Sequence, residues 1–142
     1  MCPFCNNEEM RDREIAREEL VWAFPTNIPI VPGHTLVVPV RHVEKWEDMT
    51  AAEQAAILGL FKKIKTALTK VFGTDGFNVA WNEGKLAGQS VPHFHLHVLP
   101  RKVGDTGVTG YDPRKFLYRP GSREESPAEE LRSVADAIKS AL

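Results

Sequence analysis

Three of the five histidines in this 142-residue chain, His93, His95 and His97, fall at alternate positions with an apolar residue after each. Strict alternation is the period of a β-strand, whose successive side chains point to opposite faces. The pattern predicts a half-buried strand from His93 to Leu99 with the imidazoles on one face. Successive rings on that face would stand about 7 Å apart at a rise of ~3.3 Å per residue. The chain must therefore build a sheet that presents three imidazoles in a row.

A row of imidazoles can be a plain polar face, a metal site or a nucleophile with its supporting donors. An ordinary solvent-facing strand would use Thr, Lys, Glu and Ser, which disfavours the first interpretation. Imidazole is the commonest metal ligand, so a metal site is the stronger rival. Neutral imidazole is also a good nucleophile at pH 7, because its reference pKa is ~6.5. The small polar loop Gly88-Gln89-Ser90 leads into the row and can approach a ligand closely.

The stretch from Gly88 to Leu99, with its His-x-His-x-His followed by two apolar residues, resembles the signature of the histidine triad (HIT) superfamily. The segment Pro32-Gly-His-Thr-Leu-Val-Val-Pro39 is similar to the upstream part of that family, as is Arg41-His42. Asn82-Glu83-Gly84 fits as well. The resemblance covers roughly Cys2 to Arg101. Within the superfamily, the chain resembles bacterial members of the fragile histidine triad and histidine triad nucleotide-binding branches.

We expect an α+β fold with an antiparallel sheet of about five strands, one long helix and a C-terminal helix. The resemblance implies a homodimer joined through sheet edges. Residues 1–105 would form the histidine triad domain, and residues 106–142 a C-terminal arm and helix, in the same single domain or at a dimer contact. Besides the histidine strand, the apolar pattern predicts strands at residues 15–18, 20–24, 35–39 and 76–82. The last of these should pair antiparallel with the histidine strand.

Two helices are predicted from start and stop signals. Thr50 and Glu53 have the spacing of a capping box, apolar residues recur at helical spacing after them, and Gly73 provides the stop. Near the C-terminus, Ser126 is expected as the N-cap and Pro127 as the first helical residue. The stripe on that helix consists of Leu131, Val134, Ala135, Ile138 and Leu142.

The centre of the imidazole row, His95, is our candidate nucleophile, and the resemblance implies the same position. Attack on an α-phosphorus would form a covalent nucleotidyl-histidine and divide a difficult displacement into two easier ones. His97 would donate a hydrogen bond to the phosphate or to the bridge to the leaving group, and Ser90 would assist in the same way. No metal is required for this chemistry. His34 is expected to be structural, hydrogen-bonded to its own loop, and Arg41 to be solvated.

The resemblance implies a purine nucleotide or dinucleotide as substrate. The residues matched to nucleotide-binding positions are Thr26, Asn27, Asn82, Gln89, Ser90, His95 and His97. Two substrate classes stay open, dinucleoside polyphosphates and AMP-linked phosphoramidates. Two other functions also stay open: a regulatory nucleotide-binding protein with little turnover, and a zinc-dependent interaction domain.

The pair Cys2-Pro-Phe-Cys5 allows two interpretations. A redox motif would follow a strand and open a helix, and no strand precedes Cys2. A zinc site needs two further ligands, for which His93 and His42 are candidates. The resemblance implies the same set: Cys2, Cys5, His42 and His93 would hold a structural zinc that braces the strand of the nucleophile.

Composition excludes several classes. The net charge of −1 gives no basic patch for nucleic acid, and no apolar run approaches the ~20 residues of a membrane-spanning helix. The N-terminus lacks the pattern of a secretory signal, so we expect a cytoplasmic protein with reduced cysteines. The arm Lys102–Ser126 has no periodicity. Its apolar side chains, expected to dock on a partner or on the rim of the site, are Tyr111, Phe116, Leu117 and Tyr118.

Overall fold

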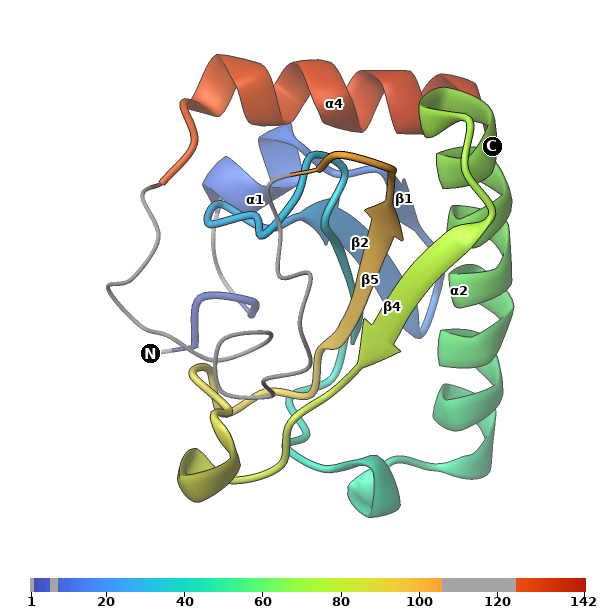
Figure 1. Cartoon of the computed structure of the whole chain (residues 1–142). Coiled ribbons are helices and arrows are strands. Elements are labelled where there is room, and N and C mark those ends of the chain that lie inside the picture. The colour runs from blue at the N-terminus through green and yellow to red at the C-terminus, as the bar shows by residue number, and fades with distance from the viewer. Residues whose placement is uncertain (1, 6–7, 106–124) are drawn as a thin grey trace.

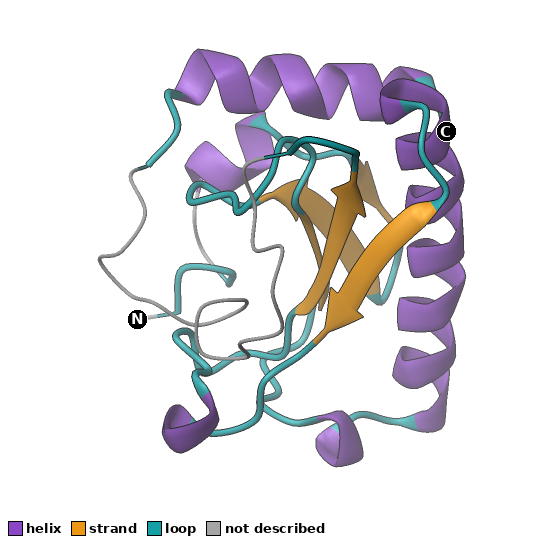
Figure 2. Ribbon diagram, viewed as in Figure 1, coloured by secondary structure: helices purple, strands orange, loops and turns teal. Residues whose placement is uncertain are grey.

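A computed structural model describes residues 2–5, 8–105 and 125–142. Its centre is a five-stranded antiparallel sheet in the order β1-β2-β3-β5-β4, flanked by helices (Figure 1; Figure 2). The predicted α+β architecture is therefore confirmed. The strands are β1 (Ala16–Arg17), β2 (Val21–Pro25), β3 (Thr35–Pro39), β4 (Gly76–Ala80) and β5 (Leu96–Arg101).

The long helix α2 (Ala51–Phe72) begins and ends at the residues that the sequence indicates. The Thr50 hydroxyl accepts the backbone N–H of Glu53, and the Glu53 carboxylate accepts the N–H of Thr50, which completes the capping box. Gly73 adopts the left-handed conformation, with φ of 64°, and its N–H donates to the carbonyl of Thr69. Two 3-10 turns, η1 (Trp46–Asp48) and η2 (Lys85–Ala87), lie in the connections.

The main core lies between α2 and one face of the sheet. Phe94, Leu96 and Val98 point into it, together with Val21 and Val37 from the neighbouring strands. Helix α4 (Ala128–Ser140) crosses one end of α2 (Figure 1) and contributes to the same core, as the buried members of its apolar stripe are Leu131, Ala135 and Ile138. These apolar contacts hold β5 in place between β3 and β4.

A second, smaller apolar cluster covers the opposite face of the sheet. Trp22 and Phe24 of β2 point into it, alternating with the core residues of the same strand. The N-terminal residue Phe4 and Met10 of the short helix α1 (Glu8–Asp12) pack on this face. The prediction of a half-buried strand is wrong in this respect: the imidazole face of β5 is buried too, because the N-terminal segment lies over it.

Several boundaries differ from the prediction: β1 and β4 are shorter than predicted, and β2 is shifted by one residue. Strand β5 begins at Leu96, because residues 93–95 lie before the segment that pairs with β3 and β4. Helix α4 begins one residue later than expected, with Pro127 as N-cap and no side-chain cap. The N–H of Ser126 donates to the carbonyl of Asn27 at 2.8 Å. Leu142, the last residue of the predicted apolar stripe, is 50% exposed. The apolar arm residues Tyr111, Phe116, Leu117 and Tyr118 lie outside the described residues.

The helices in the described ranges include none with both the length and the apolarity needed to cross a bilayer. Arg41, expected to be solvated, is exposed but forms an ion pair with Glu53, with 2.7 Å between Nη2 and Oε1. Hydrogen bonding to Arg41 is the largest of the effects that lower the pKa of the Glu53 carboxyl. The capping box is therefore tied to the end of β3.

Candidate active site and metal centre

A cavity of about 270 Å³ opens on the imidazole face of the sheet. It brings together five of the predicted nucleotide-binding residues, Thr26, Asn27, Ser90, His95 and His97. The other lining residues are Pro3, Phe4, Met10, Phe24, Ile28, His34, Leu36 and Val91. One wall is apolar and aromatic, as a planar base requires, and the other carries imidazoles and a hydroxyl.

His95 is held in one tautomer by the backbone. Its Nδ1 lies 2.8 Å from the carbonyl oxygen of His93, an acceptor, so Nδ1 carries the proton. Burial lowers the pKa of His95, which keeps the ring neutral at pH 7. In a neutral ring with a protonated Nδ1, the lone pair is on Nε2. This is the state that a nucleophilic histidine needs.

His97 is held in the opposite tautomer, through His34. The backbone N–H of Ile30 donates to Nδ1 of His34 at 3.1 Å, so the proton of His34 is on Nε2. That Nε2–H donates to Nδ1 of His97 at 2.9 Å, which leaves the proton of His97 on Nε2. The centroids of the His95 and His97 rings are 4.9 Å apart. The cavity is thus lined by one imidazole with an available lone pair and a second with an N–H donor.

The structural role predicted for His34 is confirmed by its bond to the Ile30 N–H. Its contact with His97 was not predicted. It follows from the register of β3 and β5, in which Leu36 lies opposite His97 and Thr35 opposite Val98. That register brings the start of β3 beside the end of the imidazole row. A prediction of this strand pairing would have found the contact.

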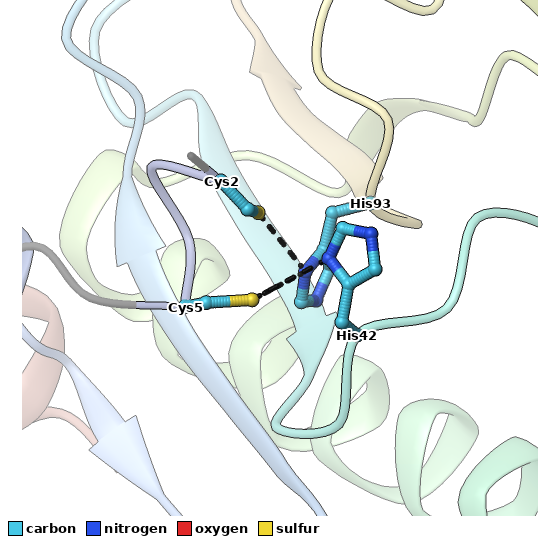
Figure 3. Close-up of side chains that lie close together, drawn as sticks. All are labelled: Cys2, Cys5, His42 and His93. Carbon is cyan, nitrogen blue, oxygen red and sulfur yellow. Dashed lines mark hydrogen bonds between the residues drawn. The ribbon is translucent and has the colours of Figure 1, made fainter.

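Cys2, Cys5, His42 and His93 converge on one point, and Figure 3 shows their side chains turned toward one another. Their ligand atoms all lie within 4.8 Å of one another. Each thiol lies close to one imidazole nitrogen. Cys2 Sγ is 3.4 Å from Nδ1 of His93, and Cys5 Sγ is 3.4 Å from Nδ1 of His42. Two thiols and two imidazoles form the donor set that tetrahedral zinc prefers.

The protonation states of this cluster fit a metal as well. Nε2 of His93 donates to the carbonyl of Pro39 at 2.8 Å, and burial lowers the pKa of His93 to about 4. Nδ1 of His93 is therefore an unprotonated ligand atom directed at the thiols. Burial, and then the neighbouring Cys2, raise the pKa of Cys5 to about 11. A thiol in such a place stays protonated unless a cation replaces its proton.

Two predicted nucleotide-binding residues do not line the cavity. The Gln89 side chain is buried and braces its own loop: its Oε1 accepts the N–H of Gly84 at 2.8 Å and its Nε2 donates to the carbonyl of Glu44 at 2.9 Å. Nδ2 of Asn82 donates to the carbonyl of Gly88 at 3.3 Å. Both amides therefore set the shape of the loop that carries Ser90.

Phe4 was not singled out by the sequence. Its ring lies edge-on to the ring of His95, with centroids 5.4 Å apart, and 5.3 Å from the ring of Phe24. The spacing of the two cysteines predicts a role for the thiols and gives no signal for Phe4, which lies between them. Met10 of α1 completes the same wall.

Comparisons with known proteins place the chain in a family. The model of the HIT domain matches residues 7–104. An asymmetrical bis(5'-nucleosyl)-tetraphosphatase of Schizosaccharomyces pombe is 39% identical over 89 residues, which cover 63% of this chain and 49% of that protein. An AP-4-A phosphorylase of Mycobacterium tuberculosis is 39% identical over 107 residues, which cover 72% and 55%. The chain spans about half the length of each of these two relatives.

A solved structure carries both the fold and a metal. The zinc-bound histidine triad family protein from Mycobacterium smegmatis is 32% identical, with a TM-score of 0.63 over 91% of this chain and 87% of that one. The family model covers more than half of the chain, and the solved structure shares its fold. The chain belongs to the HIT, or histidine triad, family.

Proposed function

We propose that this protein is a nucleotide hydrolase or nucleotidyl transferase that cleaves beside an AMP-like α-phosphate through a covalent nucleotidyl-histidine. The observation that carries the proposal is the tautomer of His95. The bond from Nδ1–H to the His93 carbonyl leaves the Nε2 lone pair on a ring that lines the cavity. An imidazole fixed in this way loses little orientational freedom when it attacks phosphorus.

The reaction has two steps. In the first, Nε2 of His95 forms a bond to the α-phosphorus, and the bond from phosphorus to the leaving group breaks with its electron pair on the leaving group. In the second, water or another acceptor attacks the same phosphorus, and the P–N bond to His95 breaks. The Nε2–H of His97 and the hydroxyl of Ser90 donate hydrogen bonds to the phosphate oxygens or the leaving group while charge develops.

The names of the relatives favour dinucleoside polyphosphates as substrates. One relative is a bis(5'-nucleosyl)-tetraphosphatase and another an AP-4-A phosphorylase. AMP-linked phosphoramidates are the second class that the same mechanism would accept, because the leaving group lies outside the AMP moiety. Thr26 and Asn27 would meet the ribose, and the wall formed by Phe4 and Phe24 the base.

We propose that Cys2, Cys5, His42 and His93 bind one zinc ion. The ion would supply structural bracing, since all four ligand positions are filled by protein and none is left for substrate. His93 would be a ligand, and its carbonyl also accepts the hydrogen bond that Nδ1–H of His95 donates. The four ligands therefore hold the turn that precedes β5.

We also propose that two copies associate through β4. This strand lies at one edge of the sheet, and its end exposes apolar surface, as Val79 and Trp81 are each 41% exposed. Pairing of two β4 edges would cover the free backbone groups and these side chains together. Sedimentation of wild type and of Val79→Lys tests this; a variant that stays dimeric contradicts it.

The experiment that tests the main proposal seeks the covalent intermediate. The protein is mixed with diadenosine triphosphate, or in parallel with an AMP–amine conjugate, quenched rapidly and examined by intact-mass spectrometry. We expect an added mass of one AMP group, located on His95 by peptide mapping. Tight nucleotide binding with neither adduct nor product would instead favour a regulatory nucleotide-binding protein with little turnover.

A further inference from the structure

The metal cluster and the nucleotide cavity share one short segment. Residues 2–5 form a turn in which the N–H of Cys5 donates to the carbonyl of Cys2 at 3.2 Å. The two thiols point toward His93 and His42 (Figure 3), while the ring of Phe4 packs over the imidazole face and lines the cavity. The four residues 2–5 therefore serve two sites.

Phe4 makes contact with both sites at once. It is only 6% exposed, and its ring centroid is 5.6 Å from that of His93 and 5.4 Å from that of His95. It therefore packs against a metal-cluster residue on one side and against the candidate nucleophile on the other. Its third aromatic neighbour, Phe24 at 5.3 Å, belongs to the wall of the cavity.

In the described part of the chain, side chains attach this segment to the sheet. A turn of four residues cannot hold a fixed position by its own backbone, because ordering each residue costs about 1–2 kcal/mol. The packing of Phe4 and the contacts of the two thiols hold it against the sheet. A metal that bridges both thiols to His93 and His42 would fix both ends of the turn, and with them the ring of Phe4.

We propose that metal and nucleotide binding are coupled through Phe4, a positioning residue whose ring is fixed by zinc at the Cys2–Cys5–His42–His93 cluster and in turn completes the cavity around the nucleotide. This inference depends on the proposed function, because it assigns the cavity to a nucleotide. Coupling between two sites is reciprocal at equilibrium. Zinc therefore raises the affinity for AMP, and AMP raises the affinity for zinc by the same factor.

The test measures both sides of this coupling. AMP affinity is measured by titration calorimetry with zinc-loaded and with chelator-treated protein, and zinc affinity by competition with a chromophoric chelator, with and without AMP. We expect at least about a fivefold change in each, with equal factors, which lies at the lower end of ordinary coupling between sites. Circular dichroism verifies that the chelated protein keeps its helices.

Two variants and one control assign the coupling to Phe4. Phe4→Ala should still bind zinc, and the change in AMP affinity between loaded and chelated protein should fall below about twofold. Phe4→Leu keeps apolar bulk and provides a folded alternative, in which the coupling should be weakened. Phe61→Ala removes the same ring from α2, on the other side of the sheet, and should keep the full coupling. If Phe4 had a purely structural role, Phe4→Ala would lower the stability of the protein without removing the coupling between zinc and AMP.

His42→Ala gives a second route to metal-poor protein, since His42 is an exposed ligand and does not line the cavity. It should reproduce the weak AMP binding of the chelated wild type. The inference is overturned if AMP affinity is the same with and without zinc, or if Phe4→Ala keeps the coupling. If AMP affinity does not depend on zinc, this inference fails and the proposed function stands. If the zinc-loaded protein does not bind AMP, the inference and the proposed function both fail.

Discussion

Nε2 of His34 lies 2.9 Å from Nδ1 of His97, and the peptide N–H of Ile30 determines which of them donates. A peptide N–H is a permanent donor, so the protons on both rings are assigned by the backbone. The donor that His97 offers to the cavity depends on His34, which lies just before β3.

Replacing His34 with Ala should lower kcat by at least about tenfold while KM changes less, because His97 loses the partner that keeps its proton on Nε2. The matched measurement is ¹⁵N NMR of the imidazoles. In the wild type Nδ1 of His97 should have the shift of an unprotonated nitrogen, and in the variant the two tautomers should mix. An unchanged tautomer in the variant would contradict this assignment.

Replacing His95 with Ala should reduce turnover by about 10³-fold or more, because the covalent route is removed and only binding and hydrogen-bond donation remain. AMP affinity should change little, since the loss is confined to the attacking group. Rates are followed by chromatography of the products and affinity by calorimetry. Ser90→Ala is the comparison, with a smaller loss expected. Turnover at the wild-type rate in His95→Ala would refute the role of this residue.

Zinc removal should leave kcat within about twofold and raise KM for the nucleotide, because the ion is placed to brace the site and not to contact the phosphate. Elemental analysis of the purified protein should give close to one zinc per chain, and Cys5→Ser should lower that ratio. If kcat disappeared with the metal and returned on its addition, at unchanged fold, the ion would have a direct part in the chemistry.

Two glycines make a matched pair for stability. Gly33 has a φ of +88°, and a Cβ there would lie 2.5 Å from Cε2 of Phe72, so Gly33→Ala should destabilise the protein by about 1–3 kcal/mol. Gly59 lies inside α2 with nothing within 4 Å of an added Cβ. Gly59→Ala should stabilise by about 0.5–1 kcal/mol. Urea unfolding of both variants measures the two free energies, and equal effects would argue against this account.

The acid limb of the stability curve should depend on Glu53. The bond from Arg41 lowers the pKa of this carboxyl in the folded protein, so its contribution is complete above the unfolded pKa of about 4.3 and is lost as the pH falls through the lower, folded value. Glu53→Gln should therefore lower stability at neutral pH and flatten the loss below pH 4–5. Thermal unfolding at several pH values, with Glu47→Gln as an exposed control, measures this difference.

The sequence predicted those parts of the fold that depend on local rules. Strand β3 begins and ends at the predicted residues, and α2 has the predicted capping box and glycine stop, because these signals involve neighbours in the chain. The four proposed zinc ligands converge as the family resemblance implied. Helix α4 begins one residue later than predicted: the N–H of Leu131 donates to the carbonyl of Pro127, which is therefore the N-cap.

What the sequence could not predict were contacts between segments far apart in the chain. Burial of the imidazole face depends on Phe4, some 90 residues before the row that it covers. The bond between His34 and His97 requires β3 to be the neighbour of β5, which no local pattern indicates. Gln89 was matched to a nucleotide contact, yet both ends of its amide are engaged by Gly84 and Glu44.

The alternation along residues 93–98 also limits how this chain can change over evolutionary time. One set of side chains fills the space under α2, and the other faces the Cys2–Cys5–His42–His93 cluster and the cavity, so the two sets are interleaved residue by residue. A single inserted or deleted residue would exchange the two sets. The imidazoles would then lie in the hydrophobic core, and Phe94, Leu96 and Val98 would lie on the opposite face. Lineages of this protein can substitute within either set, but they should not tolerate a change in length here.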